Sequence, residues 1–506
     1  MKINYLHFLI ACLAIVSVQQ LNAQTQYLNR TRYFMDNGVV APNTINPALH
    51  HPTDKKLILT SQSLKWSYVM DNIGKMESSH PYFDGIATWV RKPMMRGETW
   101  TEEDVELSTM SQIKWGKYTE NFVIVGYSDS RDFEFFNDKK WSAIIHNTEL
   151  VSKMVKAGRL KGVFIDDENY ATGSHGWKYD PAWYAGYTFE QVYEKSRERG
   201  RQVMKALQSE VKDPLVVLDF IWYGDHWNRY DTKDGRQILW MAFKDGMLDA
   251  AKSSDIFVDG NEVAYYYQEA RMFTDIYNEF RQHCFPAYGA KSLQEKYRNQ
   301  VQIGHGIYPT LMYGWCNIKN HANFPDRAKY PTYTDEENSA WWKHQLYHSL
   351  LTTDKYVWLW SEKWNWWGDE TEPLPSDMSA ILTDVKSKIN NQQGLDYEMT
   401  KFGPNWASLT PSNERWHFST IPTASVTEPA NKSVISGDFT ITTSVSANMS
   451  KVEFYINSMR VGIVDQPPYS LKINGLKKGT YSLFVRIFDG WAEGHTTSAP
   501  VVFTVK

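Results

Sequence analysis

The stretch from Gly162 to Tyr170 joins a short apolar run to three consecutive carboxylates, Asp166, Asp167 and Glu168. The apolar run predicts a strand that is buried on both faces. Adjacent carboxylates repel each other and burial disfavours their charged form, so one is expected to hold a proton while another stays ionised. Such a set supplies the acid and the base that hydrolysis of a glycosidic bond requires. The alternative interpretation is that these side chains cap the next helix or bind a structural cation.

Elements of alternating type must position these carboxylates. Short apolar runs predict strands at residues 56–60, 83–89, 122–127, 162–165, 215–222, 255–259, 307–312 and 356–360. Amphipathic segments predict helices at residues 139–156, 188–208, 236–252, 263–283, 334–351 and 376–389. This alternation predicts an α/β protein with a (β/α)8 TIM barrel. The competing open, doubly wound sheet would need a glycine-rich phosphate loop after the first strand, and the sequence has none there.

Active sites of such barrels lie at the carboxyl ends of the strands. The candidate catalytic residues at those ends are Asp166, Asp167, Glu168 and Glu262. The candidate substrate-binding residues are Trp66, Tyr127, Trp222, Tyr223, Asp225, Tyr308, Tyr313, Trp360, Glu362 and Trp364. Acids and aromatic rings that converge on one rim predict a carbohydrate cleft.

The composition of the 506 residues is that of a globular protein, with 42% hydrophobic and 22% charged residues and an unusual 21 Trp, 30 Tyr and 23 Phe. A net charge of -4 without a long basic run argues against a nucleic-acid partner. The expected partner is a polysaccharide or glycan substrate. No metal-binding histidine motif or cofactor motif is present, so neither a metal nor a cofactor is expected. The oligomeric state stays open.

Residues 1–23 predict a signal peptide, with Lys2, an apolar core and a small-residue cleavage site before Gln24. No later run is apolar for long enough to span a membrane. Export to the periplasm or the medium is therefore expected. The sequence Leu9-Ile10-Ala11-Cys12 resembles a lipoprotein box, but the apolar run continues beyond Cys12 and favours ordinary cleavage. Cys284 and Cys316 would remain, too few for a disulfide framework.

Domain boundaries follow from shifts in composition. Residues 24–56 form a polar lead-in, residues 57–390 the barrel, and residues 391–424 a linker or barrel-closing segment. Residues 425–506 contain short alternating runs, such as 439–445, 452–456, 481–487 and 501–505, which predict a β-sandwich. The segments Lys451–Asn457, Pro468–Ser470 and Gly479–Tyr481 resemble the bacterial immunoglobulin-like domains of secreted polysaccharide-degrading enzymes. The resemblance implies a spacer without chemistry of its own.

Val163 to Glu168 is similar to the Asp-x-Glu that ends the fourth strand of chitinase-like and hyaluronidase-like glycoside hydrolase barrels. This resemblance implies that Glu168 is the general acid and that Asp166 orients a substrate acetamido group. The longer Asp-rich chitinase motif is absent, since Val163 and Ile165 occupy its upstream positions. The chain also resembles α-glycosidase barrels with the nucleophile on the fourth strand and the acid/base on the sixth. That resemblance implies Asp167 or Asp166 paired with Glu262.

The sequence thus predicts a secreted glycoside hydrolase and leaves two other classes open. A non-catalytic carbohydrate-binding barrel would keep the aromatic residues without a working acid pair. A polysaccharide lyase would use a base such as His226 or Tyr223, with Arg131 or Arg229 neutralising a uronate. Glu362 is a third candidate partner carboxylate, and Asp225 with His226 a candidate substrate-binding pair. The sugar, the linkage and the stereochemical outcome are not specified by the sequence.

Overall fold

The fold is described from a computed structural model. The described residues are 38–61, 63–127, 133–168, 176–219, 221, 238–267, 270–309, 335–361, 364–367, 373–395, 422–446, 449–488 and 495–506. The predicted signal peptide and the candidates Trp222, Tyr223, Asp225, Tyr313 and Glu362 lie outside them, as do Arg131, His226 and Arg229. Among the described helices, none combines the length and the apolar character needed to cross a lipid bilayer.

The first part of the chain forms one parallel sheet with the strand order β7-β6-β5-β4-β3-β2-β1-β9-β8. The strands are β1 (Lys56–Ser61), β2 (Gly85–Trp89), β3 (Phe122–Gly126), β4 (Gly162–Asp166), β5 (Leu215–Leu218), β6 (Ile256–Asp259), β7 (Val301–Ile303), β8 (His305–Ile307) and β9 (Tyr356–Ser361). Only Gly304 separates β7, which pairs with β6, from β8, which pairs with β9. These two are halves of the seventh strand of an eight-stranded closed barrel, as predicted.

The seventh strand differs from its prediction. It spans residues 301–307 rather than 307–312, and residues 310–312 lie outside the described part of the chain. Gln302, Gly304, His305 and Gly306 interrupt the apolar pattern, so the strand carries a weak hydrophobic signal. Gly306 is required by packing, because a Cβ there would lie 2.7 Å from the Trp358 ring that fills the barrel.

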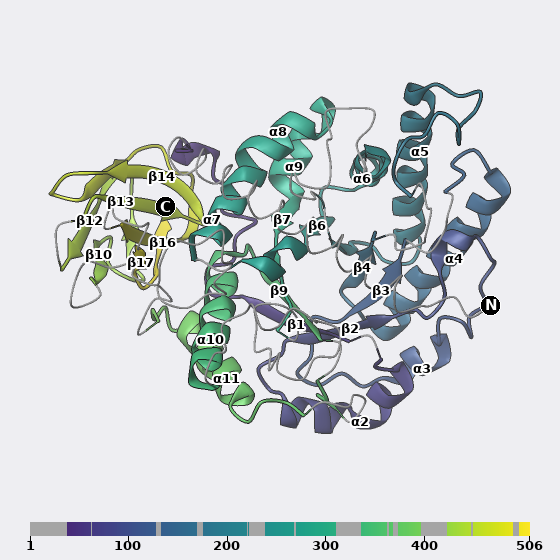
Figure 1. Cartoon of the computed structure of the whole chain (residues 1–506), viewed down its shortest axis with the longest axis horizontal. Helices are drawn as coiled ribbons and strands as arrows, with labels where there is room; N and C mark the ends of the chain where they lie inside the picture. The colour runs from purple at the N-terminus through teal and green to yellow at the C-terminus, as the bar shows by residue number, and fades with distance from the viewer. Residues whose placement is uncertain are drawn as a thin grey trace, which may run out of the picture.

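Helices surround the sheet (Figure 1). They are α2 (Trp66–Ser79), α3 (Leu107–Gln112), α4 (Asp138–Gly158), α5 (Phe189–Leu207), α6 (Ile238–Ala250), α7 (Ala270–Glu279), α8 (Phe285–Tyr288), α9 (Gln294–Gln300), α10 (Asp335–Thr352) and α11 (Met378–Asn390). A capping box begins α5, since Thr188 and Gln191 each accept a hydrogen bond from the other's backbone N–H. The predicted helix at 263–283 is shorter at its start, because residues 262–266 form the 3-10 helix η3 (Glu262–Tyr266).

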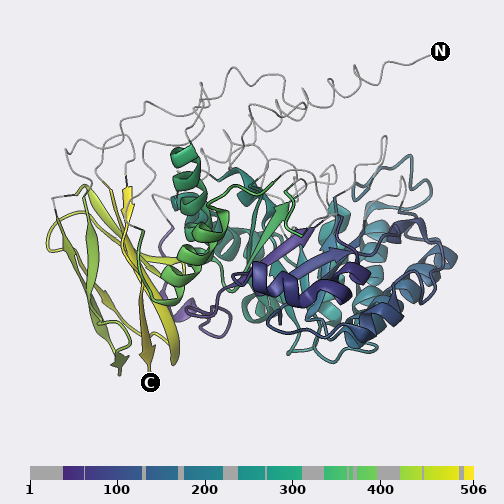
Figure 2. The ribbon, with the colours of Figure 1, turned by 90° about the horizontal axis from the view of Figure 1, so that it is seen from below.

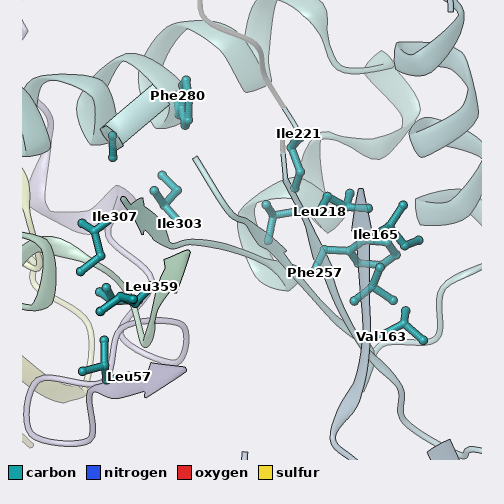
Figure 3. Packing of buried hydrophobic residues seen from close by; sticks show 14 of the residues in the cluster. Leu57, Val163, Ile165, Leu218, Ile221, Phe257, Phe280, Ile303, Ile307 and Leu359 are labelled. Atoms are coloured by element: carbon teal, nitrogen blue, oxygen red, sulfur yellow. The ribbon is translucent and has the colours of Figure 1, made fainter. Parts of the chain in front are cut away.

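Alternation along the strands produces two cores. Outward residues such as Leu57, Val163 and Leu218 pack in one core that extends to the helices (Figure 3). Inward residues fill the barrel with a separate apolar cluster, namely Ile58, Ala87, Phe122, Ile124, Phe164, Val217, Val258, Tyr356 and Trp358. The interior of the barrel is therefore filled by packed apolar side chains, and the polar residues lie at the ends of the strands.

The second part of the chain is a β-sandwich. One sheet contains β10 (Ala424–Glu428), β12 (Phe439–Val445) and β15 (Ser470–Ile473). The other contains β11 (Val434–Ile435), β18 (Val501–Val505), β16 (Gly479–Phe488), β13 (Lys451–Ile456) and β14 (Met459–Val464), with β17 (His495–Thr497) paired to β16. Two sheets of this size match the predicted immunoglobulin-like fold.

The sandwich packs directly on the barrel, beside α7 and α10 (Figure 1). Asn278 of α7 donates to Ser458 O at 2.9 Å and accepts from Arg460 N at 2.9 Å. Arg486 of β16 donates to Thr274 Oγ1 at 2.6 Å. Asp275 is buried there, and desolvation raises the pKa of its carboxyl to about 7 although Arg271 and Arg460 act to lower it. The sandwich is thus fixed to the barrel by buried polar contacts.

Candidate active site

Asp166 ends β4 with its side chain on the inner side of the sheet. Strand alternation places this side chain on the same side of the sheet as Phe164, which belongs to the apolar cluster inside the barrel. Val163 and Ile165 belong to the outer core. Asp167, the residue after the strand, is fully buried, so it is not open to a substrate. Asp166 and Glu168 are half-buried, and Glu168 N donates to Asp166 Oδ1 at 2.8 Å. The half-buried pair from this triplet is therefore Asp166 and Glu168.

Two further carboxyl groups come from the adjacent strands. Asp219 directly follows β5, and the β4–β5 register of Ile165 with Leu218 makes Asp219 the next residue opposite Asp166. Glu262 begins η3 after β6, and its backbone N–H donates to Asp219 O at 3.4 Å. Asp219 is buried and Glu262 is half-buried. Three neighbouring strands thus bring four carboxyl groups to one edge of the barrel.

Burial and mutual repulsion perturb this group. The pKa of Asp219 is raised well above its usual value by burial, then by the charges of Asp166, Glu262 and Glu168. Burial also raises the pKa of Glu262, followed by the charges of Glu168 and Asp166. A hydrogen bond with Tyr265 opposes the shift in Glu262. Some of these carboxyls therefore retain a proton at a pH at which an ordinary carboxyl is ionised.

Aromatic rings lie between the carboxyl cluster and the barrel core. The ring centroid of Tyr265 lies 5.2 Å from that of Tyr308 and 5.4 Å from that of Trp358. Trp358 packs edge-on against Phe164 at 5.0 Å, and its Nε1 donates to Gly260 O at 2.8 Å. These rings give the carboxyl cluster an apolar base, which disfavours ionisation.

A chain of hydrogen bonds fixes the turn that carries Glu262. Asn261 is fully buried and adopts a left-handed conformation, with φ of 44°. Tyr267 Oη donates to Asn261 Oδ1 at 3.2 Å, and Asn261 Nδ2 lies 2.9 Å from His305 Nδ1. His305 Nε2 lies 3.0 Å from Thr352 Oγ1, whose hydroxyl donates to His348 O. Burial lowers the pKa of His305 to about 3, so the ring is neutral with Nδ1 as acceptor.

Two predicted substrate-binding residues face the helices instead. Trp66 begins α2, and only 1% of its surface is exposed. Tyr127 follows β3 on its outer side, with its hydroxyl 3.0 Å from Thr148 Oγ1 of α4. Both aromatic side chains are enclosed in the outer core, so neither offers a face to a sugar. We do not propose either as a substrate contact.

The other described substrate-binding candidates differ in how deeply they are buried. Tyr308 is half-buried beside Tyr265, and Trp360 is half-buried next to the inward cluster. Trp364 is buried, with its ring 6.3 Å from that of Trp366. Within the described residues, no group of three or more His, Cys, Asp or Glu side chains could hold a metal ion.

Sequence reasoning missed Asp219 and Tyr265. The strand predicted at 215–222 has Asp219 in its interior, whereas β5 ends at Leu218. Aligning the fourth and fifth apolar runs would have placed it beside Asp166. Tyr265 lies in the helix predicted at 263–283, and no pattern in the sequence indicates that its ring contacts Trp358.

Replacing Asp219 by Asn is expected to stabilise the fold at pH 8 and to have little effect at pH 4. Because the folded-state pKa is raised, the folded protein binds more protons than the unfolded chain above about pH 4, so its stability falls as the pH rises. At a pH above both values, the unfolding free energy of wild type is lowered by about 1.4 kcal/mol for each unit by which the folded-state pKa exceeds the unfolded-state pKa. Melting temperatures at both pH values check this, and a lower melting temperature for the variant at pH 8 would contradict it.

The fold and site define a (β/α)8 barrel with four clustered carboxyl groups, followed by an immunoglobulin-like sandwich. The family described as bacterial Ig domain matches residues 422–485. That match is limited to the sandwich and identifies its class. No curated protein matches the chain in sequence.

Solved structures with similarity to the chain include carbohydrate-active proteins. An endo-beta-1,4-mannanase from Thermotoga petrophila is 9% identical over 90% of this chain and 99% of its own, with a TM-score of 0.36. A calcium-binding mutant of Bacteroides uniformis beta-glucuronidase 2 is 10% identical over 90% of this chain and 46% of its own, with a TM-score of 0.36.

Fibronectin(III)-like modules of CbhA from Clostridium thermocellum are 24% identical over 17% of this chain and 46% of their own, with a TM-score of 0.16. This chain thus spans about half the length of two of the three structures, with 46% covered in each. At such identities and scores, the activities of these proteins do not transfer to this chain. The function of this chain is therefore inferred from its own carboxyl cluster.

Proposed function

We propose that this protein is a glycoside hydrolase that acts on a polysaccharide or complex glycan, with Glu262 as the proton donor and Glu168 as its ionised partner. The observation that supports this is that Glu168 after β4, Asp219 after β5 and Glu262 after β6 meet at one edge of the barrel, where burial raises the pKa of Glu262. Burial is the largest cause, and the charge of Glu168 is the strongest contribution from a neighbouring residue. A carboxyl that stays protonated beside one that is ionised is the requirement for acid-assisted cleavage of a glycosidic bond.

In the proposed reaction, the bond between the anomeric carbon and the leaving oxygen breaks as the Glu262 proton passes to that oxygen. The Glu168 carboxylate either attacks the anomeric carbon or removes a proton from an attacking water molecule. Attack would form a glycosyl ester on Glu168, which water would hydrolyse with Glu262 as the base, and these two inversions would retain the anomeric configuration. Water activation would give a single inversion. Asp166 would position Glu168, because its Oδ1 accepts the hydrogen bond from Glu168 N.

This assignment differs from both alternatives that the sequence left open, which were Glu168 as acid with Asp166, and Asp167 or Asp166 paired with Glu262. With Glu168 as acid and Asp166 as the orienting residue, the raised pKa of Glu262 would have no role. With Glu262 as acid, the ionised partner comes from the end of β4, where the α-glycosidase resemblance implied Asp167 or Asp166 and the proposal has Glu168. Asp167 is a poor nucleophile candidate because its side chain is fully buried.

A panel of polysaccharides tests the proposal, with wild type compared with Glu168→Gln. We expect wild type to release reducing sugar from at least one polymer, and Glu168→Gln to be slower by on the order of 10²–10⁴-fold. The matched control is Glu210→Gln, which alters an ion pair with Lys156 on the protein surface. NMR of the first product anomer distinguishes retention from inversion.

Other outcomes would contradict the proposal. Products that absorb in the ultraviolet would indicate a lyase, and binding without cleavage would indicate a non-catalytic barrel. Equal rates for Glu168→Gln and wild type would remove Glu168 from the reaction.

We also propose export, on the basis of the predicted signal peptide at residues 1–23. The intact mass of the exported protein tests this. Cleavage before Gln24 supports ordinary secretion, and a lipid-modified amino terminus at Cys12 would indicate membrane anchoring.

A further inference from the structure

Two exposed aromatic side chains lie in the loop between β4 and α5. Trp183 is 40% exposed and Tyr187 is 43% exposed. Within the described residues, the only other large hydrophobic side chains with comparable exposure are Val39 and Val434. Most of the described Trp and Tyr residues are buried or half-buried. An exposed Trp and Tyr four residues apart therefore need an explanation beyond core packing.

The ring of Tyr187 is held in a fixed orientation. It stacks on Phe136 with the centroids 3.7 Å apart and the planes 8° from parallel. Phe136 comes from a different connection, between β3 and α4. Tyr179 Oη donates to Tyr187 O at 3.4 Å. Phe136 covers one face of the Tyr187 ring and holds the ring in one orientation, while the rest of the ring stays exposed. Little conformational entropy is therefore lost when a ligand stacks on Tyr187.

The backbone around Trp183 is also ordered. Asp180 Oδ1 accepts hydrogen bonds from Ala182 N at 2.8 Å and from Trp183 N at 3.4 Å. Tyr184 N donates to Asp180 O, and Tyr187 N donates to Tyr184 O. The residues between the two rings include exposed Ala185 and Gly186. Gly186 has a φ of 92°, and a Cβ there would meet no atom within 4 Å. Small residues thus leave space beside both rings.

The position of this loop indicates what occupies it. It belongs to the connection that begins with Asp166 and Glu168, so it lies on the carboxyl-end face of the barrel. In Figure 2 the loop before α5 lies on the upper side, toward which the strand arrows of β1 and β9 point. Flat apolar rings suit the apolar face of a pyranose. Two rings are too few for a typical protein interface, which buries about 800 Å² on each partner.

From these observations we infer that Trp183 and Tyr187 form a glycan-binding platform outside the carboxyl cluster, which holds an extended polysaccharide whose cleaved bond lies at Glu262. This inference rests on the proposed function for the identity of the ligand. The platform contributes to polymer binding and has no part in the chemical step. A long chain that reaches both places therefore gains affinity from the rings, whereas a short substrate confined to the carboxyl cluster does not.

The test measures binding separately from cleavage. Glu262→Gln is used as the background, and its retention is measured in affinity gels that contain galactomannan, xyloglucan, mixed-linkage β-glucan, arabinoxylan, amylopectin, dextran or chondroitin sulfate. Trp183→Ala and Tyr187→Ala are added singly. The control is Val434→Ala, which removes an exposed apolar side chain from the sandwich. Melting temperatures confirm that each variant is folded.

We expect one polymer to retain the background protein, and each ring variant to bind it roughly tenfold more weakly. Val434→Ala should bind as the background does. Equal retention of the ring variants, or no retention of any protein by any polymer, would overturn the platform. In the active protein, Trp183→Ala should raise KM for the polymer and leave kcat/KM for a short substrate unchanged. If the rings govern binding but no polymer is cleaved, the platform stands and the hydrolase proposal fails.

Discussion

Glu262→Gln is expected to slow cleavage of a natural polymer by on the order of 10²–10⁴-fold, the usual contribution of a general acid. The leaving oxygen of a sugar is a poor leaving group and needs the proton. An aryl glycoside with an acidic phenol leaves without that help, so the same variant should lose far less activity on it. Rates on the polymer and on the dinitrophenyl glycoside of the same sugar check this difference.

The pH dependence gives a second readout of the same residue. Cleavage needs protonated Glu262, so kcat/KM should fall as the pH rises through its pKa. Burial, followed by the charges of Glu168 and Asp166, places that pKa well above its usual value. The basic limb of the wild-type profile should therefore lie far above pH 4.5 and should be missing in the variant. Equal losses on both leaving groups, with an unchanged basic limb, would exclude Glu262 as the donor.

The largest expected effect on stability is that of Asp354→Asn, at about 3–5 kcal/mol of unfolding free energy. Asp354 is fully buried, with Arg281 Nη2 2.6 Å from Oδ2 and His50 Nδ1 3.0 Å from Oδ1. Tyr277 Oη and Ile303 N also donate to it. The substitution leaves Arg281 without its anionic partner in the interior. Urea denaturation at pH 7 measures the loss, and Glu210→Gln serves as the surface control.

This effect should itself depend on pH. Arg281, together with the hydrogen bonds to His50 and Tyr277, holds the pKa of Asp354 below its usual range against the opposing effect of burial. A depressed carboxyl pKa stabilises the fold above the unfolded-state pKa of about 3.9, and this stabilisation is lost as the pH falls through the folded-state value. The difference between wild type and Asp354→Asn should thus shrink below pH 4. A difference that stayed constant down to pH 2 would contradict the assignment.

The barrel was predictable because most of its strands are continuous apolar runs. β3 and β9 were placed within one residue of their observed bounds. The seventh strand was misplaced because its packing requires glycine and its polar residues face other elements, such as His305 toward Asn261. A local hydrophobic pattern contains no information about these long-range contacts.

The sequence predicts which strand ends carry the site residues, but it does not predict which face of the sheet each side chain occupies. Whether Asp166 or Asp167 points inward depends on a one-residue register, and alternation from Phe164 decides it only once the barrel cluster is known. The same register turns Tyr127 outward. Asp219 was missed because the end of β5 could not be located within an apolar run. Its position opposite Asp166 becomes visible only from the pairing of β4 with β5.

The contact between barrel and sandwich limits how freely the sandwich could be exchanged for another domain during evolution. Domains of this kind can be exchanged between proteins only if their surfaces tolerate a new neighbour. Here, Arg460 and Arg486 act on the charge of Asp275 from the sandwich side, and Asn278 binds the β13–β14 turn. A foreign immunoglobulin-like domain without those arginines would leave Asp275 buried with fewer cations beside it. The barrel and this sandwich are therefore expected to be inherited together as one unit.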